Sequence, residues 1–427
     1  MWASLLLCSA VGVAAGVALE LPAPALGAAA CLLVLCVSVR MWLIAADGSM
    51  DQATLALLEA ERVPWRPSTE PENKIAPECA VLVDSLNSAP ATDDEAECAE
   101  QMRTVLSNPS SLSFRSLEND PQYLLQCSEH MSSAAPGALW TRFTVSYNLY
   151  AGSIVALGSD EQRRELFGAQ AELGCFAFTE KGAGVLSGAG VETTATYDAG
   201  SDRFVIHSPT PSSHKVWISQ GLHAERAVIL AELIIDGTKY GPHLFWARIA
   251  KLGRKAGSLP ATLPGVACTT LPPKIALRGL DNAYIAFDRF EVPRGALLCR
   301  FCTVEKGGKY SQSLPDGASR MIDLLISRLL TGRICLSEGT IAYALSLVRR
   351  SWAHCSEREL WRGRKPQGPK MSTMPLISSG FRDYSRTLAV VAAFIRHTRE
   401  RVADAIRADK FSADLVEATC MCKFLGT

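Results

Sequence analysis

The sequence has no excess of charge of either sign, and this absence bears on the kind of partner to expect. Its 43 Lys and Arg residues balance 43 Asp and Glu residues over a length of 427, so the formal net charge is +0. A protein that grips nucleic acid through phosphates needs a basic surface. The composition therefore gives no reason to expect a nucleic-acid partner.

The sequence also lacks a clustered set of metal ligands. It has 14 cysteines and 7 histidines, but only one C-x-x-C pair, formed by Cys299 and Cys302, and no histidine cluster stands near it. The Cys420 and Cys422 pair is equally isolated. Because a structural zinc site needs four ligands, we expect no metal site and interpret these cysteines as ordinary thiols.

The first 46 residues stand apart because they contain almost no charge. Two apolar runs, Met1–Leu19 and Leu26–Val39, each approach the length that spans a bilayer, and no Lys or Arg precedes the first run. Three interpretations stay open. The segment is a secretory or organellar leader, a retained membrane anchor with Arg40 on the cytoplasmic side, or an extension that the mature protein does not contain.

The remaining chain is long enough for two or three packed units. Prolines at 64, 67, 71 and 77 indicate a linker, helical spacing runs from Glu95 to Leu106, and Ser159 begins another helix as an N-cap residue. Short strands follow, with a hairpin signal at Asp236-Gly237. From Ala318 the spacing is helical, over 321–344, 387–408 and 413–424. We predict boundaries at 1–46, 47–172, 173–300 and 301–427.

The stretch from Gly174 to Asp198 is the one around which the chain is organised. Cys175–Phe178 is apolar, Thr179 and Glu180 follow, and a loop with glycines at 182, 184, 188 and 190 leads into the strand-forming run ETTATYD at 192–198. A strand that ends in hydroxyl and glycine residues exposes backbone N–H groups, which a flat ligand or a phosphate can approach closely. An ordinary glycine-rich loop between two strands is the alternative.

This stretch resembles the acyl-CoA oxidase family, flavoproteins of the acyl-CoA dehydrogenase superfamily. The family pattern, aromatic-Ala-x-Thr-Glu-x-Gly-x-Gly followed by Glu-Thr-Thr-Ala-Thr-Tyr-Asp, is matched at Phe176–Glu180, Gly182, Gly184 and Glu192–Asp198. The ETTATYD run is more specific than the glycines. The resemblance implies that Thr179 hydrogen-bonds the flavin ring and that Gly182 and Gly184 belong to the cofactor loop.

Two further segments extend the resemblance toward the C-terminus. Trp217 and Ser219 stand in 215–221, which is similar to the family's K-W-W-x-G-G, so Trp217 is expected beside the flavin, where Ser219 replaces a glycine. The segment 273–282 resembles P-K-x-G-x-x-G-x-D-N, and 287–298 resembles F-D-x-x-x-I-P-R-x-x-L-L; we interpret both as defining the β-domain rather than the chemistry. Arg349 and Arg350 resemble the family's R-R-x-F, from which an arginine reaches a flavin pyrophosphate across a subunit interface.

The resemblance covers roughly residues 140 to 427 and implies an α+β fold. That fold has a helical N-terminal domain, a central β-barrel-like domain and a C-terminal helical bundle, here truncated, that forms a homodimer. The implied cofactor is FAD, and the implied reaction is the oxidation of fatty acyl-CoA to trans-2-enoyl-CoA with O2 reduced to H2O2, in the peroxisome or, through residues 1–46, at a membrane.

One part of the family's site is missing from the sequence. The family's catalytic base is a glutamate in a Y/F-E-G-D/E-N segment, and nothing in this chain matches that segment. Glu180 belongs to the flavin motif, so we predict no catalytic residue. The alternatives are an acyl-CoA oxidase that is incomplete as written, a non-catalytic flavin or acyl-CoA binding homologue, and an acyl-CoA dehydrogenase.

Overall fold

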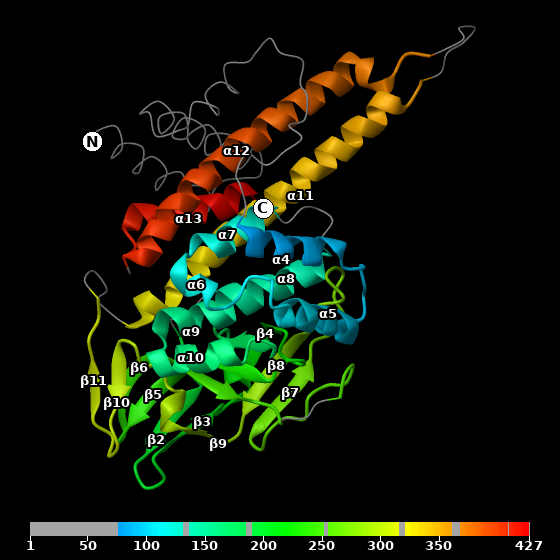
Figure 1. Cartoon of the computed structure of the whole chain (residues 1–427). Coiled ribbons are helices and arrows are strands. Elements are labelled where there is room, and N and C mark those ends of the chain that lie inside the picture. The colour runs from blue at the N-terminus through cyan, green and yellow to red at the C-terminus, as the bar shows by residue number, and fades with distance from the viewer. Residues whose placement is uncertain are drawn as a thin grey trace, which may run out of the picture.

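The structure is a computed structural model that describes residues 76–130, 136–184, 190–251, 255–315, 321–360, 368–408 and 410–426. Residues 1–46, with their leader and anchor interpretations, lie outside the described residues. A domain of curled sheets occupies one end of the molecule, a layer of helices lies across it, and a long helical hairpin projects beyond that layer (Figure 1). The α+β organisation predicted from the sequence is confirmed.

The helical layer is built from short helices with local start and stop signals. At α5, the Asp94 carboxylate accepts a hydrogen bond from Glu97 N (2.8 Å), and the helix ends where Asn108 was predicted to stop it. At α10, Ser159 and Gln162 form a reciprocal capping box. The helices are α4 Pro77–Ser88, α5 Glu95–Ser107, α6 Ser116–Asn119, α7 Gln122–His130, α8 Gly137–Thr144, α9 Gly152–Leu157 and α10 Asp160–Gly168.

A π-helical segment, η1 Val145–Ala151, connects α8 to α9. Its side chains reach three other parts of the molecule. The Tyr147 hydroxyl donates to Leu112 O (2.7 Å) within the helical layer, and the Tyr150 hydroxyl accepts from Trp246 Nε1 (3.0 Å) in the sheet domain. Asn148 accepts from Thr331 Oγ1 (2.6 Å) in the C-terminal bundle.

The sheet domain consists of a six-stranded, a three-stranded and a two-stranded sheet. In the largest sheet β5 is central, because it pairs parallel with β1 and β2 and antiparallel with β6. The β5–β6 turn has Asp236 and Gly237 at φ 48° and 78°, which confirms the predicted hairpin. The strands are β1 Gly174–Ala177, β2 Thr194–Asp198, β3 Arg203–His207, β4 Lys215–Ser219, β5 Arg226–Ile235, β6 Thr238–Arg248, β7 Val266–Thr270, β8 Asn282–Phe287, β9 Phe290–Pro293, β10 Cys302–Val304 and β11 Tyr310–Gln312.

Strand β1 lies between two hydrophobic cores, which explains its uninterrupted apolar sequence. Cys175 and Ala177 point into the core between the sheets, whereas Phe176 and the following Phe178 point into the core shared with the helices. Both faces of β1 are buried by these two cores, and β1 pairs in parallel with β5 at the end of the strand order. The residues that follow β1 therefore emerge at a point fixed by packing on both sides.

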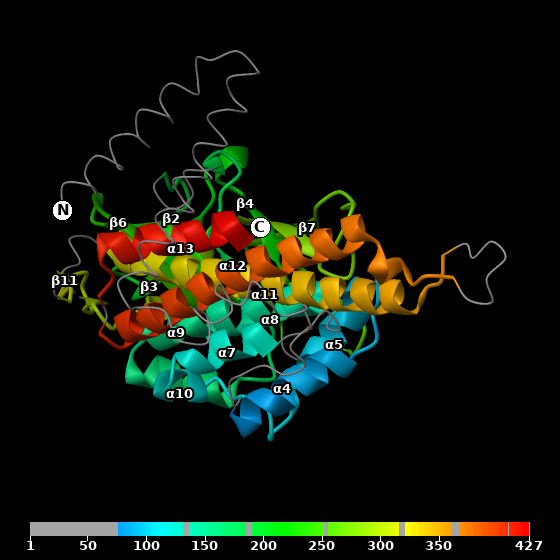
Figure 2. The same cartoon turned by 90° about the horizontal axis from the view of Figure 1, so that it is seen from above.

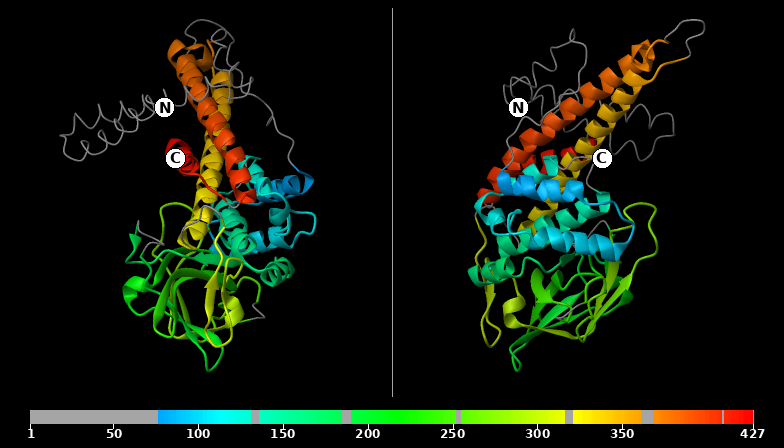
Figure 3. Two further views of the ribbon diagram at one scale, coloured as in Figure 1. Left: turned by 90° about the vertical axis from the view of Figure 1, so that its left-hand side faces the viewer. Right: turned by 45° about the vertical axis from the view of Figure 1, so that its right-hand side comes forward.

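The C-terminal region contains three helices: α11 Met321–Glu357, α12 Pro375–Arg407 and α13 Ala413–Gly426. The first two are longer than the sequence predicted and form an antiparallel pair whose far end stands clear of the sheet domain (Figures 2 and 3). The β10–β11 hairpin precedes them, so strands continue to Gln312, past the expected boundary at residue 300. Among the described residues, no helix is long and apolar enough to cross a membrane.

Candidate functional site

The first sequence-predicted site residue, Thr179, stands where β1 leaves the two cores. Its carbonyl oxygen accepts a hydrogen bond from Val216 N (2.9 Å), so it lies against β4 of the second sheet. The next residue, Glu180, forms an isolated bridge with Lys215. The Thr179 side chain is half-buried, and within the described residues its hydroxyl makes no hydrogen bond. This hydroxyl is free to bind a ligand.

Trp217 is presented to solvent by an irregularity in β4. The pairing of β4 with β8 shifts register between Lys215 and Ile218, and Trp217 adopts a φ of 59°. Its side chain is 60% exposed, although Val216 and Ile218 on either side are buried. A bulky residue in the left-handed region is a local strain that needs support from its surroundings. The Trp217 indole is therefore exposed two residues after Lys215, which pairs with Glu180.

Ser219 ends β4, and its hydroxyl accepts a hydrogen bond from Asn282 Nδ2 (3.0 Å). The neighbouring Asp281 is buried and forms ion pairs with Arg142 (2.7 Å) and His223 (3.0 Å). Burial opposes ionisation of Asp281, but the hydrogen bond from His223 and the charge of Arg142 hold its pKa below the usual value. The D-N segment predicted to define the β-domain thus has a structural role here, and it supports Ser219.

Glycine is favoured at positions 182 and 184 of the predicted cofactor loop for two different local reasons. Gly182 N donates to Ser212 O (2.8 Å), and a Cβ at Gly182 would lie 2.9 Å from the Ser212 Cβ, so glycine is required for this approach. Gly184 has a φ of 51° with open space around the position of a Cβ. The glycine at 188 lies outside the described residues. Gly182 and Gly184 are exposed, on the same side of the fold as the end of β1.

Glu180 is buried in an ion pair with Lys215, at 2.8 Å. Burial alone would raise the pKa of Glu180, but the Lys215 charge and hydrogen bonds hold it below the usual value. The carboxylate also accepts hydrogen bonds from Glu192 N (2.8 Å) and Thr193 N (3.0 Å). A carboxylate held in this way is a poor proton acceptor. The interpretation that Glu180 is not a catalytic base stays a prediction.

Arg349 and Arg350 lie in the last turns of α11, where both side chains are exposed. That end of α11 points away from the sheet domain (Figure 3). The structure of one chain therefore does not bring these arginines together with Thr179, Trp217 and Ser219. The expected role of Arg349 and Arg350 across a subunit interface stays a prediction.

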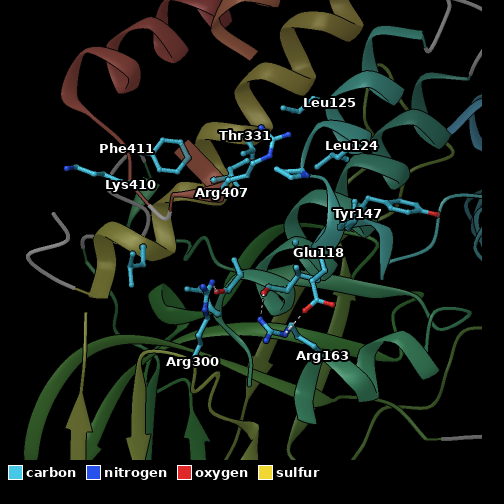
Figure 4. A pocket seen from close by; sticks show the side chains of 18 of the residues that line it. Glu118, Leu124, Leu125, Tyr147, Arg163, Arg300, Thr331, Arg407, Lys410 and Phe411 are labelled. Carbon is cyan, nitrogen blue, oxygen red and sulfur yellow. Dashed lines mark hydrogen bonds and ion pairs between the residues drawn. The ribbon is translucent and has the colours of Figure 1, made fainter. Parts of the chain in front are cut away.

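A cavity of about 310 Å³ lies where the helical layer, the sheet domain and the C-terminal bundle meet (Figure 4). Sequence reasoning did not find its lining, because the residues come from elements far apart in the chain. Its apolar wall includes Leu124, Leu125 and Val155, and Phe301 and Phe411 lie at its edges.

The polar side chains at this cavity are predominantly basic: Arg163, Arg300, Arg407 and Lys410, with Glu118 and Asp323. Two of the arginines are partly neutralised, since Arg163 pairs with Glu118 (3.1 Å) and Arg407 with Asp120 and Asp404. Lys410 is exposed and has no ion-pair partner among the described residues. An apolar cavity with a basic rim suits a ligand with a hydrocarbon part and an anionic part.

Solved structures of an acyl-CoA oxidase and of an acyl-CoA dehydrogenase share the fold of most of this chain. Caenorhabditis elegans acyl-CoA oxidase-2, solved with FAD, ascaroside-CoA and ATP, aligns over 88% of this chain and 55% of its own at a TM-score of 0.59 and 21% identity. An acyl-CoA dehydrogenase from Mycobacterium smegmatis aligns over 88% of this chain and 82% of its own at a TM-score of 0.55 and 17% identity. The chain has the fold of the acyl-CoA oxidases and dehydrogenases.

Its curated relatives are more specific. Arabidopsis thaliana acyl-coenzyme A oxidase 2, peroxisomal, is 29% identical over 338 residues, which cover 73% of this chain and 47% of the relative. Mus musculus acyl-coenzyme A oxidase-like protein is 32% identical over 196 residues, 45% of this chain and 30% of the relative. No family model matches the chain. The resemblance to acyl-CoA oxidases is confirmed, and the chain spans about half the length of the Arabidopsis relative.

Proposed function

We propose that this chain provides the flavin-binding and acyl-CoA-binding part of an acyl-CoA oxidase. The observation that carries the proposal concerns Thr179, Trp217 and Ser219. The Thr179 hydroxyl makes no hydrogen bond to a described residue, and the exposed Trp217 indole lies on β4, which meets the segment after β1 through the hydrogen bond from Val216 N to Thr179 O. A bound FAD would supply the hydride acceptor for oxidation of the acyl group, with O2 as the final electron acceptor and H2O2 as its product.

The residues present fit a flavin. An isoalloxazine ring is flat and aromatic, with polar edges, and it needs an aromatic or apolar face to pack against and donors for its carbonyl groups. The Trp217 indole supplies such a face, and the Thr179 hydroxyl supplies a donor that no described residue occupies. Gly182 and Gly184 keep the adjacent backbone clear of side chains. Arg349 and Arg350 would serve the pyrophosphate of a partner subunit's cofactor.

The cavity between the three layers is the proposed place of the substrate. Its apolar wall would take the hydrocarbon chain, and the basic rim would take the phosphates of CoA through Arg300 and Lys410. Thr331, which lines the cavity, is held by its hydrogen bond to Asn148 in η1. The lining of the cavity is therefore linked to the helical segment that packs on β1.

The proposal extends to the compartment and the assembly of this chain. Several curated relatives are named as peroxisomal acyl-CoA oxidases, and we propose the same compartment for this chain. We also propose a homodimer, because Leu347 and Leu376 on α11 and α12 are 66% and 82% exposed and the interface role of Arg349 needs a second copy.

A titration of the purified 427-residue chain with FAD tests the proposal. We expect flavin absorbance to remain with the protein after removal of free FAD, and we expect Trp217→Ala to weaken that retention. Leu259→Ala, which removes an exposed side chain between β6 and β7, provides the matched control. Folded protein that retains no FAD at saturating cofactor would overturn the proposal.

A further inference from the structure

We infer that Lys215 is a positioning residue for the flavin loop: its ammonium, through Glu180, fastens the end of β1 to both flanks of the glycine loop and so sets the affinity for FAD. The inference rests on the FAD site proposed above, and it adds a residue to which neither the sequence motifs nor the resemblance gave a role. It also makes flavin retention depend on the charge of one buried side chain.

The contacts of Lys215 are directed at the segment that carries Thr179. Its side chain is 0% exposed, and Nζ donates to Glu180 Oε1 at 2.8 Å, to Leu230 O of β5 at 2.6 Å and to Phe178 O at 3.5 Å. Phe178 and Glu180 are the two neighbours of Thr179 in the chain. The ammonium therefore holds the backbone on both sides of the residue whose hydroxyl is proposed to bind the flavin.

Glu180 extends this hold to the other flank of the loop. One carboxylate oxygen accepts from Glu192 N and the other from Thr193 N, while Lys181 N donates to His214 O at 3.0 Å. The ion pair thus joins the end of β1, the start of β4 and the residues that precede β2. A buried carboxylate left without its cation would be strongly destabilised, so loss of the Lys215 charge would also weaken the hydrogen bonds that Glu180 accepts.

The position of the pair links it to the flavin contacts rather than to the general core. Lys215 is the last residue of β4 that pairs with β8 before the register shift, and Trp217 lies within the shift, so the residue that anchors the strand precedes the one that turns outward. Loss of the anchor would free both Trp217 and Thr179 to move. A pair that merely filled the core would not be bonded to both neighbours of a ligand-facing residue.

The charge of Lys215 is sensitive to pH near neutrality. Burial lowers the pKa of its ammonium to about 8, and the Glu180 carboxylate, from the loop after β1, opposes that shift. From β5 and from the end of β1 the ammonium faces backbone carbonyl oxygens, those of Leu230 and Phe178. Loss of its proton removes the cation from Glu180 while the carboxylate keeps its charge. Flavin affinity should therefore fall as pH rises through about 8.

The first experiment measures the dissociation constant of FAD for the full chain from pH 7 to pH 9.5, with Glu180→Gln as the variant. Glu338→Gln is the matched control, because Glu338 forms an equally buried ion pair with Arg399 (3.2 Å) in the helical bundle. We expect the wild-type constant to rise about ten-fold per pH unit above pH 8, Glu180→Gln to weaken FAD at pH 7 by about ten-fold or more, and its pH profile to be flat. Equal effects of the two variants, or a flat wild-type profile, would overturn the inference.

The second experiment needs no cofactor. Lys181 is exposed and follows Glu180 directly, so trypsin cleavage after it reports whether the loop is held. We expect faster cleavage at this site in Glu180→Gln than in Glu338→Gln, at equal cleavage elsewhere. If the wild-type chain binds no FAD but this difference is present, the proposed function fails and the positioning role stands. If FAD binds and neither measurement separates the variants, the positioning role fails alone.

Discussion

Gly339 of α11 lies where that helix crosses α8, and its replacement by alanine offers a sharp test of the packing there. A Cβ at Gly339 would lie 2.3 Å from Trp140 Cζ2 and 2.8 Å from Trp140 Cε2. The indole of Trp140 is buried and also contacts Tyr343 edge to face at 6.5 Å between ring centroids. The ring has no flexible end that could move aside.

Two opposing terms set the magnitude. Alanine is favoured over glycine inside a helix by about 1 kcal/mol, whereas an extra carbon forced into a packed core costs roughly 1–3 kcal/mol. Gly380 of α12 gives a control without the packing cost, because the nearest atom to a Cβ built there is Tyr384 Cε2 at 4.0 Å. The helix term cancels between the two variants. Gly339→Ala should therefore be less stable than Gly380→Ala by roughly 1–3 kcal/mol.

Urea unfolding followed by far-ultraviolet circular dichroism compares the free energies of unfolding of the two variants with that of the parent chain. We expect Gly380→Ala to shift the midpoint to higher urea and Gly339→Ala to shift it to lower urea, with unchanged slopes. If Gly339→Ala stabilised the chain as much as Gly380→Ala does, α11 and α8 could not be in the contact described.

Three further outcomes are expected. Thr179→Val removes one hydroxyl donor and should weaken FAD by about 0.5–1.5 kcal/mol, measured by absorbance titration, with no change in unfolding midpoint. Because the pKa of Asp281 is lowered in the folded chain, its contribution to stability is present above about pH 4 and lost as pH falls through the folded value. Asp281→Asn should therefore reduce the loss of unfolding free energy at acid pH. An unchanged loss would contradict the stabilising role of the ionised Asp281. With Glu180 held by Lys215, peroxide release from acyl-CoA by this chain should stay near background; robust release abolished by Glu180→Gln would show that the base was misplaced.

The sequence predicted those features that depend on neighbours in the chain. The capping box at Ser159, the stop at Asn108 and the turn at Asp236-Gly237 are all local, and each lies where it was expected. The apolar run of β1 was also recognisable, because a strand buried on both faces leaves a continuous signal. Motif resemblance also pointed to Thr179 and Trp217 from residues close together in the sequence, and their role in a flavin site stays a prediction.

The remaining features depend on contacts that no local pattern contains. Lys215 and Glu180 are 35 positions apart, and a lysine in a strand is ordinarily read as solvent-exposed. The cavity is lined from the helical layer, the sheet domain and the bundle, so its existence follows from how they meet. The outward turn of Trp217 needs a register shift that alternation of residue types does not reveal.

The π-helical segment η1 has a consequence for how this chain tolerates change in length. Ser146 accepts a hydrogen bond from Gln220 (3.1 Å), and together with Tyr147, Asn148 and Tyr150 it spreads contacts around the segment toward three parts of the molecule. A π-turn holds one residue more than an α-turn. Removal of one residue from 145–151 would let the segment close to an ordinary α-helix, so the flanking helices α8 and α9 would keep their phase while the side chains within the segment change direction. Substitutions here cost single contacts, whereas a one-residue deletion would turn the polar side chains away from sheet and bundle at once.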